Sequence, residues 1–198
     1  MSLILASRSE RRLALLKSIG LYDICVIPSH LDETPHKKEL PKKLSERLAY
    51  EKSFKVFQER TGDALLKNVL GADTVVGCGR RIISAPETDK EAYQCLDLLS
   101  GRSHRVYTSL CLISPAGKIW QRSVETRVLF KGLSEEEKEA YVKSQEGFGK
   151  AGGYAIQGFA GSFVKRINGS YSCILGMPLF EVRNLLQNIG FSLLPSTK

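Results

Sequence analysis

The first twenty residues constrain the fold most, because an apolar run passes through a short polar turn into a helical pattern. The run covers residues 3–6, the turn begins at Ser7, and apolar side chains then recur at helical spacing over residues 13–19, before Gly20. This order predicts a strand, a turn and a helix. Hydroxyl and backbone N–H groups at the start of a helix, with guanidinium groups in its first turn, are suited to binding a phosphate chain.

A simpler interpretation of the same turn is a helix cap. Ser7 and Glu10 match an S-x-x-E capping box, and the arginines that follow would then be an ordinary solvated first turn. Cations in a first turn oppose the helix macrodipole, so Arg11 and Arg12 need a compensating anion, which Glu10 supplies in part, or a functional reason. Phosphate binding is therefore a hypothesis that this segment alone does not decide.

Length and composition indicate a globular chain. The 198 residues, 42% of them hydrophobic and 25% charged, predict one sizeable domain, or two small lobes, with a real core. No apolar stretch approaches the roughly 20 residues that cross a bilayer, and Ser7 and Arg8 interrupt the first run too early for a signal peptide. The five cysteines form no C-x-x-C pair and are expected to be core residues in a reducing compartment. We therefore expect a soluble, cytoplasmic protein with no membrane partner.

The charge balance favours an acidic ligand. Lysine and arginine exceed aspartate and glutamate to give a formal net charge of +8. The basic residues lie in scattered pairs without an aromatic platform, and a solvated surface explains most of them. We therefore expect a small anionic ligand and no polynucleotide.

Strand and helix patterns alternate along the chain. Strands are expected over residues 3–6, 22–28, 69–76, 104–113 and 118–130, with helices between several of them. Thr88 with Glu91, and Ser134 with Glu137, form capping boxes, and Pro178 suits the first turn of a last helix. This alternation predicts an α/β fold with a mixed sheet.

A lysine interrupts the apolar face of the helix expected over residues 44–60. The row formed by every fourth residue reads Leu44, Leu48, Lys52 and Val56. Lys52 therefore borders the buried face. Either its stem packs while its ammonium reaches water, or the side chain points into a cleft that binds an anion.

An aspartate lies inside the apolar strand run of residues 71–76. An ionised carboxylate among apolar neighbours is costly unless it is paired, hydrogen-bonded or bound to a metal, so we favour a ligand or catalytic role for Asp73. The alternative is a strand-end aspartate that faces solvent or caps a turn. Asp32 and Glu33 are weaker candidates, because acidic loop residues usually face water.

Glycines 147, 149 and 152 match the G-x-G-x-x-G dinucleotide fingerprint, but their context does not. The fingerprint follows a strand and opens a helix, whereas here a helix precedes it and the strand-like residues 154–156 follow. We expect instead a flexible basic loop, containing Lys150, that runs into a strand ending at Gln157. Gln157 offers a donor and an acceptor to the edge of a nucleobase, or is an ordinary surface residue.

Together these segments resemble the Maf family of nucleoside triphosphate pyrophosphatases, over residues 3–190. The resemblance rests on L-A-S-R-S-E-R-R (5–12), D-E (32–33), L-A-Y-E-K (48–52), G-A-D-T-V-V (71–76), S-G-R-S-H-R-V (100–106), Glu146, K-A-G-G-Y-A-I-Q-G (150–158) and G-M-P-L (176–179). It implies a Maf/ITPase-like α/β fold, with a twisted mixed sheet, flanking helices and two lobes around a central cleft. It also implies a single domain over residues 1–198 without a separable linker, and commonly a homodimer.

The resemblance also implies an activity and a set of site residues. The family hydrolyses the α-β phosphoanhydride of a nucleoside triphosphate, giving the monophosphate and pyrophosphate, with a divalent cation that we expect to be Mg²⁺ or Mn²⁺. The residues that would hold the phosphates are Ser7, Arg11, Arg12 and Lys52, with Lys150 as a further substrate-binding residue. Glu33 and Asp73 would serve the metal and the attacking water, with Asp73 as the proton acceptor. Arg11, Thr74 and Gln157 are similar to the specificity set of the branch that acts on dTTP and UTP, rather than the branch that acts on 7-methyl-GTP.

Two positions depart from the family pattern. Glu10 replaces the usual proline, and either adds negative charge beside the phosphate site or pairs with an arginine. Ala85 stands where the family has a lysine before Pro86, and the loss of one cation from a phosphate clamp costs about 10²-fold or more in rate. Arg80 or Arg81 is a candidate replacement. The alternative function is therefore a regulatory module that binds nucleotides with weak or no turnover.

Overall fold

The computed structural model describes residues 3–191. Its helices and strands, in chain order, are β1 (Leu3–Leu5), α1 (Glu10–Ser18), β2 (Ile24–Val26), α2 (Pro41–Glu59), β3 (Asn68–Cys78), β4 (Arg81–Ile83), α3 (Asp89–Leu99), β5 (Ser103–Ile113), β6 (Ile119–Phe130), α4 (Glu135–Lys143), β7 (Val164–Asn168), α5 (Tyr171–Ile174) and α6 (Leu179–Gln187). Short 3₁₀ helices are η1 (Gly62–Leu66), η2 (Ala151–Gly153) and η3 (Phe159–Phe163).

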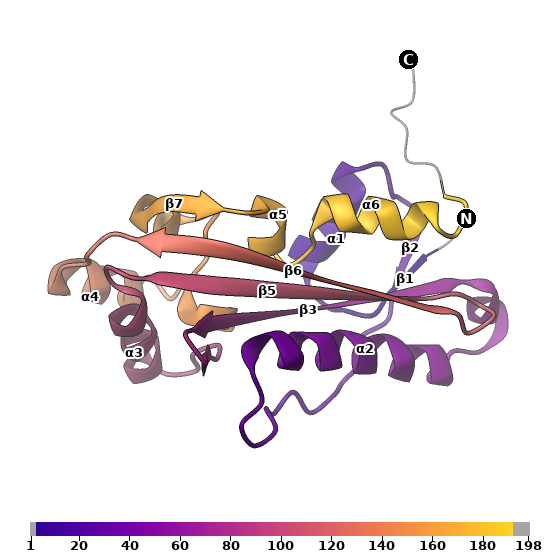
Figure 1. Cartoon of the computed structure of the whole chain (residues 1–198), viewed down its shortest axis with the longest axis horizontal. Coiled ribbons are helices and arrows are strands. Elements are labelled where there is room, and N and C mark those ends of the chain that lie inside the picture. Colours follow the sequence, from indigo (N-terminus) through magenta and orange to yellow (C-terminus); the bar gives the residue numbers. More distant parts are fainter. Residues whose placement is uncertain (1–2, 192–198) are drawn as a thin grey trace, which may run out of the picture.

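One seven-stranded mixed sheet organises the chain. Its strand order is β2-β1-β3-β5-β6-β7, and β4 pairs with β3 outside this path. β1 is parallel to β2 and to β3, whereas the pairs β3-β5, β5-β6 and β6-β7 are antiparallel. The long strands β3, β5 and β6 twist along the length of the molecule (Figure 1). The predicted α/β class with a mixed sheet is confirmed.

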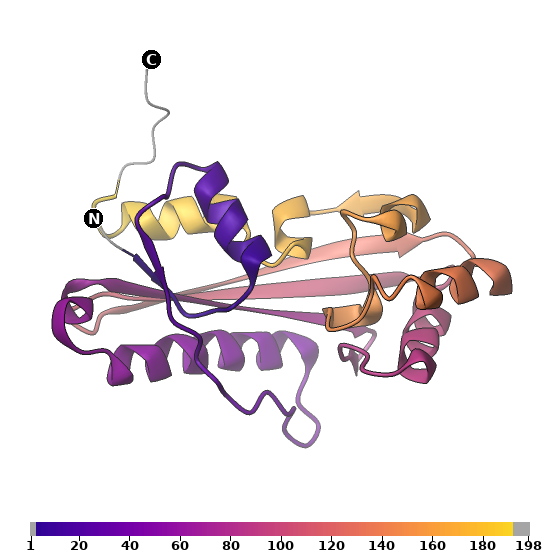
Figure 2. The ribbon, with the colours of Figure 1, turned by 180° about the vertical axis from the view of Figure 1, so that it is seen from behind.

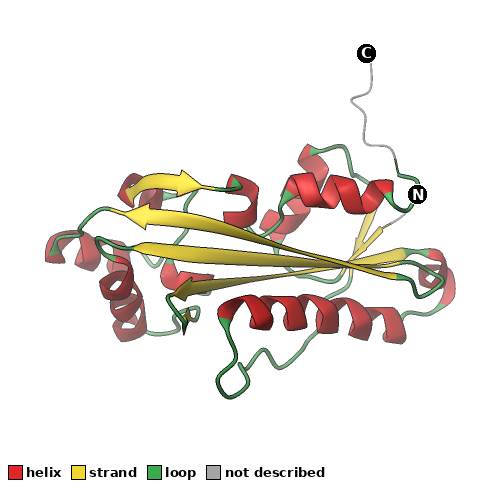
Figure 3. Ribbon diagram, viewed as in Figure 1, coloured by secondary structure: helices red, strands yellow, loops and turns green. Residues whose placement is uncertain are grey.

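Helices cover both faces of the sheet. α2 lies along one face, and α1 and α6 cover the other face at the end that holds β1 (Figures 1 and 3). A core cluster there joins Leu5, Leu16, Leu110, Met177 and Leu185, all buried. A second cluster, which includes residues of α3, α4 and η3, fills the other end of the sheet.

The edge of β3 has a gap between two short partners. β1 pairs with residues 68–70 of this edge, and β4 pairs with residues 76–78. Residues 71–75 lie between these two ladders, while their other side pairs continuously with β5. The gap leaves this part of β3 open to the segments that precede α1 and follow α5.

Several boundaries differ from the sequence prediction. β2 is shorter than the predicted range of residues 22–28, and the short strands β4 and β7 were not predicted. The side chains of β7 are exposed or half-buried along its whole length, so its sequence shows no alternation of apolar and polar residues. The expected strand over residues 154–157 is wrong. Tyr154 is extended, but it belongs to no strand of the described sheet, and the chain turns at residues 156–157. Just before it, Gly152 and Gly153, with φ angles of +79° and +70°, pack against Val76 and Cys95.

The capping boxes at Ser134 and at Thr88 are both present. The alternative that Ser7 and Glu10 cap α1 is wrong. The N-cap is Ser9, whose hydroxyl accepts from the backbone nitrogen of Arg12 at 3.5 Å. The last helix begins one residue after Pro178, which is its N-cap.

The contact between α2 and β3 is unusually close. A Cβ atom added at Gly71 would lie 2.2 Å from Ser53 Oγ and 2.8 Å from the backbone oxygen of Ala49. This approach brings Lys52, on α2, next to Asp73, on β3.

We predict that Gly71→Ala lowers the free energy of unfolding by about 1–3 kcal/mol, because the new methyl group forces α2 away from β3. Urea denaturation measures this loss. Gly132→Ala is the matched control, since no atom lies within 4 Å of the Cβ that it adds. An equal loss in the two variants would contradict the close-contact explanation.

Candidate functional site

Two adjoining cavities lie beside the gap in β3. The inner cavity has a volume of about 340 Å³ and the outer cavity about 620 Å³. Both are lined by Arg11, Arg12, Glu33, Lys150 and Gln157, so they form one continuous site. The inner cavity also has apolar walls, which include residues 75–76 of β3 and residues 82–83 of β4. In Figure 2 the turn before α1 and the segment that leads to α2 lie on the side facing the viewer.

The structure places every predicted site residue on this pair of cavities. These residues are Ser7, Arg11, Arg12, Glu33, Lys52, Asp73, Thr74, Lys150 and Gln157. They come from the turn before α1 and its first turn, the segment after β2, α2, β3, and the loop that follows α4. Segments far apart in the sequence therefore converge at one place.

A buried lysine joins two carboxylates in this site. Lys52 Nζ lies 2.6 Å from Asp73 Oδ1 and 2.7 Å from Glu33 Oε1. Lys52 is 7% exposed and Asp73 is 4% exposed, whereas Glu33 is exposed. The lysine therefore points into the site, and the snorkelling alternative is wrong.

Burial sets the proton affinity of Asp73. Loss of solvent raises the pKa of Asp73 above its ordinary value, and the positive charges of Lys52 and Arg12 act against this rise. The carboxylate is therefore a stronger proton acceptor than an aspartate in water. Its negative charge is balanced only because two cations lie beside it.

The guanidinium group of Arg12 is held from three directions. Its Nε atom donates to the backbone oxygen of Gly176 at 2.9 Å. Its terminal nitrogens donate to Ser7 Oγ and to Thr74 Oγ1, each at 3.1 Å. An arginine has five N–H groups, so two remain without an acceptor among the described residues. Burial lowers the pKa of Arg12, but the ordinary pKa of a guanidinium group is very high. The group therefore stays positively charged and can bind an anion.

The hydroxyl group of Ser7 is also prepared for an anion. Its oxygen accepts from the backbone nitrogen of Ser9 at 3.2 Å and from Arg12. Its own hydrogen has no acceptor among the described residues, and Ser7 lines the outer cavity. Ser7 can therefore donate to an oxygen atom of a bound phosphate.

The carboxylates of Glu33 and Asp73 suit a divalent cation that is bound jointly by the protein and by the phosphates of a ligand. Among the described residues there is no group of three or more His, Cys, Asp or Glu side chains that could hold a metal alone. Mg²⁺ is usually bound by one or two carboxylates together with substrate phosphates and water. One oxygen of each carboxylate bonds Lys52, and the second oxygen has no protein partner within residues 3–191.

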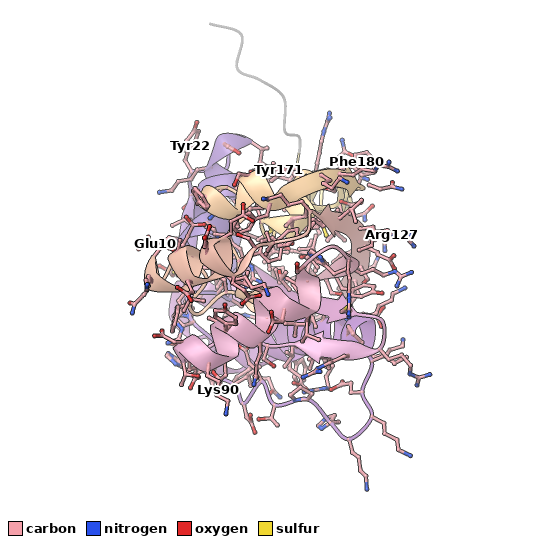
Figure 4. The ribbon with its side chains drawn as sticks, turned by 90° about the vertical axis from the view of Figure 1, so that its left-hand side faces the viewer. Glu10, Tyr22, Lys90, Arg127, Tyr171 and Phe180 are labelled. Atoms are coloured by element: carbon pink, nitrogen blue, oxygen red, sulfur yellow. The ribbon has the colours of Figure 1, made fainter. Side chains whose placement is uncertain are left out.

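The two departures from the family pattern both lie in the site. Ala85 lines the inner cavity, and neither Arg80 nor Arg81 lines either cavity, so neither takes the place of the missing lysine. Glu10 lines the outer cavity and makes no ion pair with the part of the chain that is described, so it adds negative charge beside the cavity and the alternative that it pairs with an arginine is wrong. Seen end-on, Glu10 lies on the opposite side of the molecule from Arg127 (Figure 4).

Sequence reasoning assigned no role to several groups that support the site. Thr108 on β5 contacts Thr74, and Gly176, with φ +94°, lets Arg12 approach its carbonyl group. His104 Nε2 lies 2.8 Å from the hydroxyl oxygen of Tyr154, which lines the inner cavity, and burial lowers the pKa of His104 to about 4. The placement of a threonine and a histidine among apolar strand residues was the signal available in the sequence.

Comparison with known proteins gives the family. The sequence model described as "Maf-like protein" matches residues 2–189. The chain belongs to the Maf-like family. A protein of Mesorhizobium japonicum named dTTP/UTP pyrophosphatase is 53% identical to this Maf-like chain over 194 residues, covering 96% of the chain and 93% of that protein. A protein of the same name from Paramagnetospirillum magneticum is 52% identical over 190 residues, covering 96% and 98%.

Among solved structures, a HAM1 protein from Coxiella burnetii is 16% identical and aligns with a TM-score of 0.45, covering 95% of the Maf-like chain and 99% of that protein.

None of the helices described here has the length and apolar character needed to span a membrane.

We predict that Lys52→Met raises the pKa of Asp73 further, because the substitution removes a cation that stabilises the carboxylate. Carboxyl-carbon NMR titration of labelled protein measures the shift. Lys138→Met is the matched control, since Lys138 Nζ also bonds two carboxylates, at 2.6 Å and 2.7 Å, but none of its partners lines either cavity. An unchanged or lower pKa for Asp73 in Lys52→Met would contradict the electrostatic assignment.

Proposed function

We propose that this Maf-like protein hydrolyses the α-β phosphoanhydride of a pyrimidine nucleoside triphosphate, dTTP or UTP, to the monophosphate and pyrophosphate. The names of the relatives at about half identity support this activity. The observation that carries it is the buried Lys52, bonded to Asp73 and Glu33 next to an Arg12 with two N–H groups that have no acceptor within residues 3–191. This arrangement places cations for phosphates beside carboxylates for water and metal.

The two cavities suggest how a nucleotide is oriented. The outer cavity, with Ser7, Arg11 and Arg12, suits the triphosphate, because these groups offer hydroxyl and guanidinium donors. The inner cavity has apolar walls together with Thr74 and Gln157, and suits the base. Lys150, whose Nζ donates to a backbone oxygen at 2.6 Å, lines both and would add charge near the phosphates.

Glu33 and Asp73 would hold a Mg²⁺ or Mn²⁺ ion through their free oxygens. When bound, such an ion neutralises developing phosphate charge and orients water. Lys52 keeps the two carboxylates at a fixed separation. The metal requirement is part of the proposal, as are the roles of these residues.

The protein groups can divide the reaction between them. Asp73 accepts a proton from the water whose oxygen forms a bond to the α-phosphorus, and the bond from that phosphorus to the bridging oxygen breaks. The electron pair of the broken bond leaves with pyrophosphate, whose charge Arg12, Arg11 and Ser7 stabilise. Because these donors are already ordered by the protein, little reorganisation is needed as charge develops.

A homodimer, a cytoplasmic location and a single two-lobed domain over residues 1–198 stay predictions from the family resemblance. They are independent of the reaction proposed here.

We predict that Asp73→Asn lowers kcat with UTP by about 10²–10⁴-fold, because the amide cannot accept the proton. Ion-exchange chromatography of the products should show UMP and pyrophosphate from the wild type. Formation of UDP and phosphate instead would overturn the assignment. Asp97→Asn is the control, because Asp97 is ion-paired with Lys138 and lines neither cavity.

The pH dependence gives a second readout of the same residue. Since the ionised carboxylate is the active form and burial raises its pKa, kcat/KM should fall as the pH drops through a value above the ordinary 3.8 of aspartate. The residual activity of Asp73→Asn should lack this acidic limb.

The second candidate function is a regulatory module that binds nucleotides with little turnover. The observation that favours it is Ala85, whose methyl group lines the inner cavity and supplies no positive charge. The wild type would then be stabilised thermally by UTP without forming product.

We predict that Ala85→Lys raises kcat by about tenfold or more, because it adds a cation at the wall of the site. Steady-state assays with UTP and Mg²⁺ or Mn²⁺ measure the change in kcat. Ser84→Lys is the matched control, since Ser84 is adjacent, exposed and also lines the inner cavity. An equal gain from both substitutions would indicate a general effect of charge rather than a specific position.

A further inference from the structure

A chain of hydrogen bonds runs from Arg12 into the core of the protein. Arg12 Nη2 lies 3.1 Å from Thr74 Oγ1, which lies 3.0 Å from Thr108 Oγ1. Thr108 Oγ1 lies 2.7 Å from the backbone oxygen of Cys173. Thr108 is fully buried on β5, and the sheet register places it directly opposite Thr74.

The groups at the two ends of this series of hydrogen bonds determine which atom donates in each bond. The carbonyl group of Cys173 can only accept, so the single hydroxyl hydrogen of Thr108 is directed to it. Thr108 must then accept from Thr74, whose own hydrogen is thereby used. The guanidinium of Arg12 can only donate, so Thr74 accepts from it. All three bonds are satisfied in one direction only.

This direction decides what Thr74 can offer to a ligand. Its hydroxyl oxygen gives its hydrogen to Thr108 and one lone pair to Arg12, which leaves one lone pair. Thr74 is half-buried and lines the inner cavity, which Gln157 also lines. Any ligand atom that bonds Thr74 Oγ1 must therefore be a donor.

We propose that Thr108 is a positioning residue that makes Thr74 an acceptor and thereby favours bases that carry an N–H group at N3 over bases that carry a lone pair there. Uracil and thymine have a hydrogen on N3, whereas N3 of cytosine accepts. This inference rests on the proposed function, because it assumes that the base of a nucleoside triphosphate occupies the inner cavity. Without the Thr108 hydroxyl, the Thr74 hydrogen is free to rotate and can serve an acceptor as well.

A purely structural role for Thr108 gives a different expectation, and Thr126 supplies the comparison. Thr126 is also fully buried, on β6, and its hydroxyl bonds both the oxygen and the nitrogen of Ser170 at 3.0 Å and 2.9 Å. It therefore ties a strand to the start of α5, as Thr108 ties its strand to the carbonyl of Cys173. It has no bond to Arg12 or Thr74 among the described residues.

The experiment compares kcat/KM for UTP and for CTP in the wild type, Thr108→Val, Thr108→Ser and Thr126→Val, with urea denaturation of each variant. Thr108→Val keeps the shape of the side chain and removes the hydroxyl group. We expect it to lower the UTP/CTP ratio about fivefold to tenfold, the value of one hydrogen bond. Thr108→Ser should restore the wild-type ratio, and Thr126→Val should leave the ratio unchanged even where it lowers stability.

The outcomes separate this inference from the proposed function. A wild type that turns over UTP, with an unchanged ratio in Thr108→Val, overturns the inference alone. A ratio that falls equally in Thr126→Val also overturns it, because general loosening would then be the cause. A wild type that forms no UMP from UTP overturns the proposed function and the inference with it. Should Thr108→Val not fold, Thr108→Cys, whose thiol is a weak donor, must show a lower ratio than Thr108→Ser.

Discussion

The buried ammonium group of Lys52 is the interaction on which the site depends. It supplies positive charge to a carboxylate that has almost no contact with water, and it fixes a second carboxylate that extends from a surface segment. Removing one member of such a buried pair is expensive, because the remaining charge has no compensation. The close contact between α2 and β3 at Gly71 lies next to this ion pair, so close packing and charge pairing both hold α2 against β3.

Much of this arrangement was predictable from the sequence, for identifiable reasons. Lys52 interrupts a regular apolar row and Asp73 interrupts an apolar strand, and an ionisable residue in such a place needs a partner. Because burying an unpaired charge is unfavourable, the sequence identifies both residues as needing a partner. It does not show that they are partners of each other. Their pairing follows from the way α2 lies against β3, which no local sequence pattern shows.

Other parts of the fold were not predictable, because contacts distant in the sequence decide them. The strand expected at residues 154–157 is absent, since Tyr154, although extended, belongs to no strand of the described sheet and the chain turns at residues 156–157. The interpretation of Ser7 as a helix cap rested on spacing alone, but its hydroxyl oxygen accepts a hydrogen bond from the guanidinium group of Arg12 instead. A local pattern cannot reveal a competing partner that tertiary structure brings near.

The open stretch of β3 between its two short partners has a consequence for how this chain can change. Asp73 contacts α2 on one face of the sheet, and Thr74 contacts Arg12 on the other. The pairing of residues 68–70 with β1 and of residues 76–78 with β4 fixes the number of residues between them. A single residue inserted or deleted in this interval would turn side chains to the opposite face of the sheet, so that Asp73 would lose α2 and Thr74 would lose Arg12. Lineages of this protein should therefore keep a constant number of residues in the interval from residue 70 to residue 76, whereas the turn between β5 and β6, which is mostly exposed and lines neither cavity, should tolerate insertions and deletions.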